Sequence, residues 1–97
     1  MKVVFTEDAL CDLDEILRFI GRNYPTISLA FEKRLHALLE RIGTWPKSAQ
    51  EVVDRPGVRA APLIRYPYKV FYRVTDDAVE ILHIHHGARR QPWEEEN

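Results

Sequence analysis

The chain is poor in several features that would each define a class of protein. Cys11 is the single cysteine among 97 residues, so no disulfide can form within the chain and no pair of thiolates is available to a metal ion. No apolar run approaches the roughly 20 residues that a membrane-spanning helix requires, and we expect no membrane association. The chain starts with the strand-like segment KVVF and lacks the apolar stretch of a secretion signal, so the expected location is the cytoplasm.

No linker, internal repeat or low-complexity tract divides the sequence. A chain of 97 residues is large enough for a single hydrophobic core and too small for two. We therefore predict one domain over residues 1–97, in which the acidic segment at residues 91–97 is a frayed end.

The net charge of -1 conceals an uneven distribution. Residues 1–54 carry seven Lys and Arg against nine Asp and Glu, whereas residues 55–90 carry seven against three. The second half of the domain is therefore cationic, and its histidines can add charge on mild acidification. Such a surface attracts acidic partners.

Two amphipathic helices are predicted in the first half of the chain. Apolar residues recur at steps of three and four from Ala9 to Tyr24, behind Thr6 as an N-terminal cap. This pattern places Asp12 among the outward-facing polar residues. A second stripe runs from Thr26, its expected cap, to Gly43. Because the link between the helices is short, they must run antiparallel as an α-hairpin.

The other predicted elements are strands. Runs of β-branched and aromatic residues indicate them, and turn-forming residues separate them. They cover residues 2–5, 58–64, 68–74 and 79–84. The order β-α-α-β-β-β predicts an α+β fold in which the N-terminal strand is followed by the α-hairpin, packed on a small antiparallel β-sheet. Trp45 is expected to pack against the core, and residues 47–57 are expected to form a surface loop.

Short motifs follow one another along nearly the whole chain. They are Phe5-Thr6, Asn23-Tyr24-Pro25, Pro56-Gly57-Val58-Arg59, YKVFYRV at residues 68–74 and ILHIHHGAR at residues 81–89. In this order and spacing they resemble the RelE/ParE superfamily of bacterial toxins. The resemblance implies the toxin of a type II toxin–antitoxin system, of the kind that stabilises plasmids. It also implies a small cognate antitoxin, encoded beside the toxin, that silences it and through which alone operator DNA would be contacted.

Two activities compete within this superfamily. ParE-like toxins poison DNA gyrase and are not nucleases, whereas RelE-like toxins cut mRNA at the ribosome. The RelE-like pattern adds clustered lysines before the central strands and a tyrosine near the C-terminus, but this chain has Ala60-Ala61-Pro62-Leu63 and an acidic tail, which would repel RNA. The sequence therefore favours a ParE-like gyrase inhibitor that is not an enzyme. A RelE-like, ribosome-dependent mRNA endonuclease is the alternative.

Basic residues supply most of the candidate target-binding groups. We assign this role to Arg59, Arg73, Arg89, Arg90 and Trp93. Under the nuclease alternative, Arg59 and Arg89 would hold the phosphate while His85 or His86 moved protons.

The same residues have simpler interpretations. Arg59 can be a solvated charge at a strand end, and Arg73 can pair with Asp76 or Glu80 across the turn. Trp93 can equally fold back over the core.

Aromatic residues are concentrated around the first strand of the predicted β-hairpin. The candidate antitoxin-binding residues are Tyr66, Tyr68, Phe71 and Tyr72. Together they are more aromatic surface than a small monomer usually leaves exposed in one place. The expected cover is an amphipathic helix or an added strand of the antitoxin, which folds as it binds.

Three histidines occur close together at the end of the hairpin. His83 and His85 alternate along a strand and therefore project from one face, while His86 follows directly. The sequence places no third ligand beside the first two, so we expect no metal site and no cofactor. They are interpreted as hydrogen-bonded histidines at a sheet end.

Overall fold

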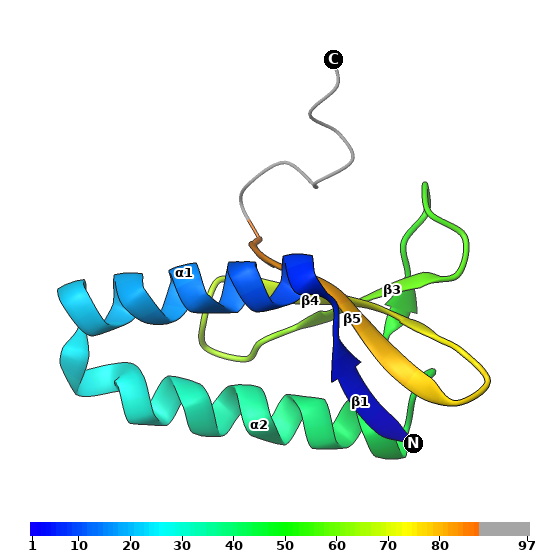
Figure 1. Ribbon diagram of the computed structural model, residues 1–97, viewed down its shortest axis with the longest axis horizontal. Coiled ribbons are helices and arrows are strands. Elements are labelled where there is room, and N and C mark those ends of the chain that lie inside the picture. Colours follow the sequence, from blue (N-terminus) through cyan, green and yellow to red (C-terminus); the bar gives the residue numbers. More distant parts are fainter. Residues whose placement is uncertain (88–97) are drawn as a thin grey trace.

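The computed structural model describes residues 1–87, which form two α-helices and a five-stranded sheet. In chain order the elements are β1 (Lys2–Phe5), α1 (Glu7–Asn23), the 3-10 turn η1 (Pro25–Ile27), α2 (Ser28–Thr44), β2 (Gln50–Glu51), β3 (Val58–Pro62), β4 (Tyr68–Val74) and β5 (Ala78–His86). The predicted α+β fold and its element order are confirmed (Figure 1). The short strand β2 is an addition within the expected surface loop.

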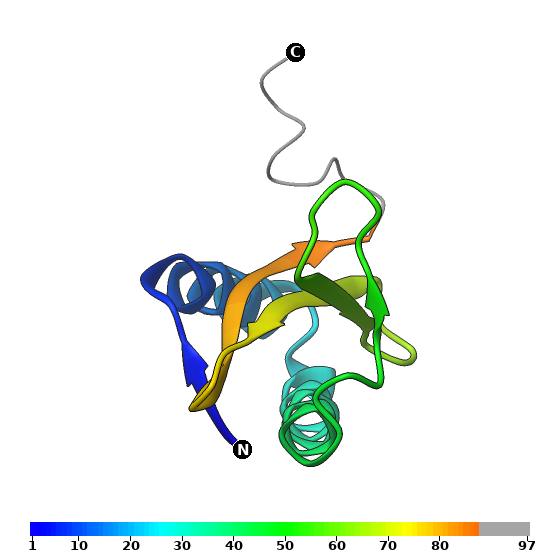
Figure 2. The ribbon, with the colours of Figure 1, turned by 90° about the vertical axis from the view of Figure 1, so that its right-hand side faces the viewer.

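The sheet is mixed rather than wholly antiparallel. Its strand order is β1-β5-β4-β3-β2, and every pair is antiparallel except β1 and β5, which run parallel with Lys2 opposite Ala78. Since β4 occupies one edge of β5, β1 pairs along the other edge and satisfies its backbone groups there. Figure 2 shows the sheet curling above α2, with α1 on the β5 side.

The first helix, α1, begins where the sequence predicts. Thr6 is its N-cap, and the Thr6 hydroxyl oxygen accepts a hydrogen bond from the Ala9 N–H at 3.2 Å. Glu7 and Asp8 lie in the first turn, where the helix dipole favours carboxylates. The buried side chains of α1 are Ala9, Ile16 and Ile20. One stripe of the helix therefore faces the core.

The second helix, α2, begins later than predicted. Pro25, Thr26 and Ile27 form the turn η1, so the N-cap position falls on Ile27, which makes no side-chain capping bond. Thr26 is therefore not the cap. The buried residues of α2 are Phe31, Leu35, Ile42 and Gly43. Within residues 1–87, neither helix is long and apolar enough to cross a lipid bilayer.

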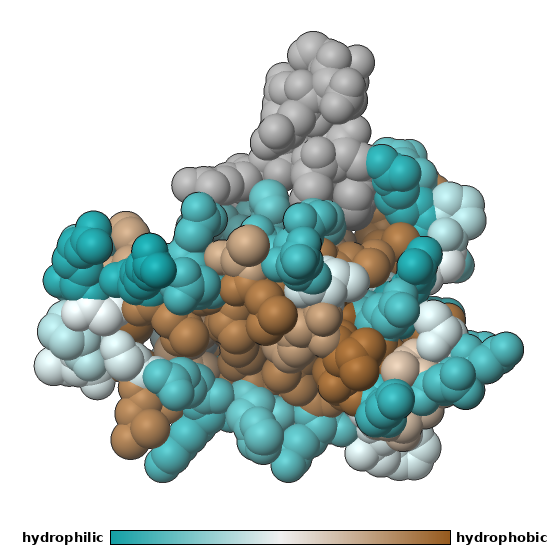
Figure 3. Space-filling model, in the orientation of Figure 1, coloured by the Kyte–Doolittle hydropathy of each residue, from teal (hydrophilic) through white to brown (hydrophobic). Residues whose placement is uncertain are grey.

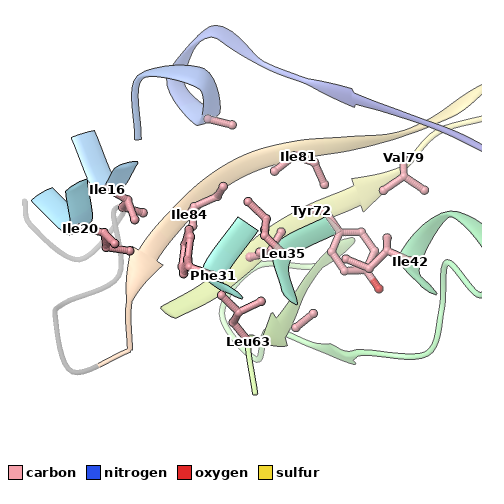
Figure 4. Close-up of a cluster of buried hydrophobic side chains, with 13 residues drawn as sticks. Ile16, Ile20, Phe31, Leu35, Ile42, Leu63, Tyr72, Val79, Ile81 and Ile84 are labelled. Atoms are coloured by element: carbon pink, nitrogen blue, oxygen red, sulfur yellow. The ribbon is translucent and has the colours of Figure 1, made fainter. Parts of the chain in front are cut away.

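The hydrophobic core lies between the two helices and one face of the sheet (Figure 4). Phe31, Ile42 and Tyr72 are each at most 1 % exposed. Figure 4 shows Ile42 beside the Tyr72 ring and Phe31 near Ile84. Burying one large apolar side chain stabilises the folded state by about 1.5–3 kcal/mol. The two helices pack mainly against the sheet and less against each other. The sheet is therefore what holds the α-hairpin in place.

A β-bulge decides which side chains of β5 reach the core. The register with β4 shifts between Phe71 and Tyr72, so that Leu82 has no partner residue on β4. This extra residue inverts the alternation of side chains, and both Ile81 and Ile84 reach the core. The histidines on either side of Ile84 consequently project away from it.

Trp45 does not pack against the core, contrary to prediction. The residue is 66 % exposed, while its backbone N–H closes α2 by donating to the Arg41 carbonyl. Tyr72 and Ile42 already fill the neighbouring part of the core.

The N-terminus is fixed against the end of α2. The Met1 amino group donates to the Gly43 carbonyl at 2.8 Å. A Cβ atom on Gly43 would lie 3.0 Å from the Met1 carbonyl oxygen and 3.3 Å from Val3 Cγ2. Glycine therefore permits the close approach of β1 to α2.

Candidate functional site

Arg59 lies on β3 in the interior of the sheet. It is opposite Tyr72 on β4 and Glu51 on β2. Its guanidinium donates hydrogen bonds to the Ala49 carbonyl at 2.7 Å and to the Lys47 carbonyl at 3.4 Å. Arg59 is therefore not a freely solvated charge, because it ties the segment before β2 to the sheet.

Tyr72 holds the same segment through its hydroxyl group. The Tyr72 O–H donates to the Pro46 carbonyl at 2.7 Å, and the residue is 0 % exposed. Burial raises the pKa of the phenol, and this rise is opposed by a backbone hydrogen bond at Ala49 and by the positive charge of Arg59. The neutral phenol therefore has a structural role, because its hydrogen bond to Pro46 fixes the segment between α2 and β2.

Arg73 pairs with Glu80, one of the two partners, Asp76 and Glu80, that the sequence suggested. It lies opposite Glu80 in the β4–β5 register, and its Nε is 2.8 Å from Glu80 Oε1. The Arg73 side chain is 57 % exposed, so the pair contributes little to stability. It does give the guanidinium a carboxylate partner within the protein.

The histidines of β5 meet a carboxylate from α1. Asp12 Oδ2 lies 3.3 Å from His83 Nδ1 and 3.9 Å from His85 Nε2. The same oxygen accepts a hydrogen bond from the Ile84 backbone N–H at 3.0 Å. These three side chains are only 20–28 % exposed, so the prediction of an outward-facing Asp12 was wrong.

Helical spacing contained the information needed to place Asp12. The buried residues of α1 include Ala9 and Ile16, and Asp12 comes three residues after the first and four before the second. Residues at these spacings share one face of a helix. A carboxylate on a buried stripe requires a polar partner from another element, and β5 supplies the His83 imidazole and the Ile84 N–H. The sequence alone could not identify those partners.

A cavity of about 670 Å³ opens beside this cluster, between α1 and the end of β5. Its polar lining comes from Asp12, Glu15, Arg18, Arg22, Asn23, His85 and His86. Tyr68 also lines it, with its ring edge-on to that of His86 at a centroid distance of 5.6 Å. Both histidines named as proton carriers under the nuclease alternative therefore face a hollow of mixed charge.

The exposed aromatic surface predicted on the sheet is not present. Phe71 and Tyr72 are 1 % and 0 % exposed, and Tyr66 and Tyr68 are half-buried. Tyr66 and Tyr68 lie edge-on against Phe31 of α2, with ring centroids 5.3 and 5.8 Å apart. Because the sheet curls over α2, these tyrosines complete the core and do not form a free docking face.

Three further candidates, Arg89, Arg90 and Trp93, lie outside the residues that the structure describes. Their assignment to target binding stays a prediction from the sequence.

This fold also occurs in a toxin–antitoxin structure. Eleven chains of solved structures match, and one of them is described as "Chromosomal ParDE TA system from P. aeruginosa". It has 25 % sequence identity and a TM-score of 0.75, and the match covers 89 % of this chain and 95 % of that one. This chain therefore shares its fold with a chain of that toxin–antitoxin system. A comparison with curated protein sequences gives no match.

A comparison of the sequence with protein-family models identifies the family. The family model described as "ParE toxin of type II toxin-antitoxin system, parDE" matches residues 3–91. The chain belongs to this ParE toxin family and is a toxin of the type II class. The resemblance predicted from the short motifs is thereby confirmed.

Replacing Tyr72 by phenylalanine removes the hydroxyl that binds the Pro46 carbonyl. We expect Tyr72→Phe to lower the free energy of unfolding by about 1 kcal/mol at neutral pH. In the wild type, burial keeps the phenol protonated in the folded state, whereas in the unfolded chain it ionises near its usual pKa of 10.0. Wild-type stability should therefore be kept below pH 10 and be lost as the pH rises further, a loss that Tyr72→Phe lacks.

Urea unfolding at several pH values from neutral to alkaline measures both effects. Tyr24→Phe, at a tyrosine that is 55 % exposed, is the control and should reproduce the wild-type curve. An alkaline loss of equal size in Tyr72→Phe and the wild type would contradict the prediction.

Proposed function

We propose that this protein inhibits bacterial growth in the cytoplasm by binding and poisoning DNA gyrase, without cleaving nucleic acid itself. The observation that carries the proposal is membership of the ParE toxin family, whose model matches residues 3–91. We propose further that a small cognate antitoxin, encoded by a neighbouring gene, neutralises it. Operator DNA is contacted only through that antitoxin.

The contacts of Arg59 and Arg73, the two candidate arginines that the structure describes, support a non-catalytic mechanism. A metal-free ribonuclease needs cationic groups free to neutralise a phosphate, together with groups that move protons. Arg59 instead binds backbone carbonyls, and Arg73 pairs with Glu80. The positions after Arg59 on β3 are Ala60, Ala61 and Pro62, which offer no charge. This arrangement suits a protein that acts by binding.

The groove between β1 and α2 is the proposed antitoxin site. It has a volume of about 840 Å³, and Val3, Phe5 and Leu39 supply much of its apolar lining. Figure 3 shows a hydrophobic band along the face between the two helices, bordered by hydrophilic residues. His36 and Glu40 line the groove on the α2 side. An apolar groove with a polar rim fits the apolar face of an amphipathic antitoxin helix.

Purified components test the choice of target. We expect the full-length protein to inhibit supercoiling by gyrase and to stabilise cleaved DNA, while leaving ribosome-programmed mRNA intact. Arg89→Ala combined with Arg90→Ala should weaken the inhibition at least about tenfold, because both charges are assigned to the target contact. Lys33→Ala, which removes one charge from α2, is the control. Cleaved mRNA with unaffected supercoiling would contradict the proposal and favour the endonuclease alternative.

The groove is tested by placing a charge in its apolar lining. Leu39→Glu should raise the Kd for the product of the adjacent antitoxin gene at least about tenfold, because a carboxylate would face the apolar side of the bound helix. Leu29→Glu is the matched control, since Leu29 lies on the same helix, is 65 % exposed and does not line the groove. Circular dichroism checks that both variants are folded. Equal losses in the two variants, or none in Leu39→Glu, would refute the proposed site.

A further inference from the structure

We propose that Asp12, His83 and His85 bind one divalent transition-metal ion, with Zn²⁺ as the preferred ion. Within residues 1–87, this is the one group of three or more His, Cys, Asp or Glu residues whose ligand atoms lie close enough to one another to bind a single metal ion. Two imidazole nitrogens and one carboxylate oxygen form a donor set that suits Zn²⁺ and related ions. From the sequence we expected no metal site because no third ligand lay beside the two histidines, and the fold supplies that ligand, Asp12, from α1.

The fold positions the carboxylate before any ion arrives. The Thr6 hydroxyl donates to the Ile81 carbonyl at 2.9 Å, which fixes the start of α1 against β5. One and a half turns later, Asp12 Oδ2 accepts the Ile84 N–H at 3.0 Å. Metal-binding carboxylates are usually held by a hydrogen bond of this kind from a neighbouring group. The helix and the strand therefore present the oxygen in a fixed place.

The spacing of the ligand atoms fits a small cation. In a tetrahedral zinc site, with bonds of about 2.0–2.2 Å, neighbouring ligand atoms are about 3.4 Å apart. Asp12 Oδ2 is 3.3 Å from His83 Nδ1 and 3.9 Å from His85 Nε2, and all three ligand atoms lie within 4.8 Å of one another. The His83 and His85 rings are nearly perpendicular, at 88°. Binding of the ion requires the side chains to rotate until the three ligand atoms reach tetrahedral spacing.

His85 also lacks hydrogen bonds that would otherwise account for its position. Its Nδ1 is buried without a partner in the described part of the chain, and its Nε2 is too far from Asp12, at 3.9 Å, for a hydrogen bond. A buried imidazole nitrogen without a hydrogen-bond partner is costly, and among the described residues Nε2 also makes no hydrogen bond. An ion bound at Nε2 would give that nitrogen a strong partner.

The cluster is open to solvent on one side. Asp12 and His85 line the cavity of about 670 Å³ between α1 and β5. With three protein ligands, a zinc ion keeps a fourth position for water or for a ligand that enters through this cavity. A bound ion would also join α1 to β5, and so stabilise the folded state by an amount that rises with the logarithm of the free ion concentration above the Kd.

Calorimetry and thermal unfolding of the full-length chain, freed of metal with a chelator, test the proposal with ZnCl₂ as the probe. We expect one Zn²⁺ per chain and a melting temperature that rises with zinc concentration. Co²⁺ bound in the same place should give the strong visible absorption of a tetrahedral site. Absence of one-to-one binding would overturn the proposal.

His85→Gln is the informative variant because His85 makes no hydrogen bond to another described residue, so the fold should survive the change. We expect it to raise the Kd for Zn²⁺ at least about tenfold and to abolish the zinc-dependent rise in melting temperature. His36→Gln is the matched control, since His36 is exposed on α2 and pairs with Glu40 at 3.4 Å, a spacing that could itself attract zinc. If His85→Gln retained wild-type affinity, or if His36→Gln lost it equally, the ion would bind elsewhere and the assignment would be wrong.

Discussion

The structure depends on how the backbone hydrogen-bonding groups are satisfied along the edge of β5 that β1 does not cover. β1 pairs with β5 only as far as Ile81, and β5 continues to His86. After β1 the chain turns directly into α1, and residues at and after the start of this helix bind the backbone groups of β5. Thr6 binds the Ile81 and Leu82 carbonyls, and Asp12 binds the Ile84 N–H. A helix therefore completes an edge that a longer strand would otherwise have to cover.

This arrangement determines where polar side chains gather. The bulge at Leu82 turns His83 and His85 away from the core, and the edge contact brings Asp12 to them. On the other side of the sheet, Arg59 is used to hold the segment before β2. Arg59, Asp12 and His83 therefore all form contacts with other groups of the protein itself.

The sequence predicts the local elements well and the long-range contacts poorly. The spacing of apolar residues and the Thr6 cap predict α1 because both features are local. The parallel pairing of β1 with β5 and the bulge at Leu82 depend on residues far apart in the chain, and no local pattern encodes them. We predicted an outward-facing Asp12 because it is polar, although its spacing from Ala9 and Ile16 places it on the buried stripe of α1.

The aromatic residues illustrate the same limit. A tyrosine has an apolar ring and a polar tip, so composition does not decide whether it is a surface or a core residue. Tyr72 is buried because Pro46 offers an acceptor to its hydroxyl, and Tyr68 is half-buried because Phe31 offers a ring to pack against. Both partners lie on distant parts of the chain. Only the folded structure reveals them.

Hydrogen exchange at the Ile84 amide, measured by NMR in the presence of a chelator, tests the edge contact most directly. Asp12→Ala removes the acceptor and should speed exchange of this amide at least about tenfold, because a hydrogen bond to a charged group is worth about 1.5–3 kcal/mol. Asp14→Ala, which removes an exposed carboxylate paired with Arg18, should leave it unchanged. Equal protection of the Ile84 amide in the wild type and in Asp12→Ala would contradict the account.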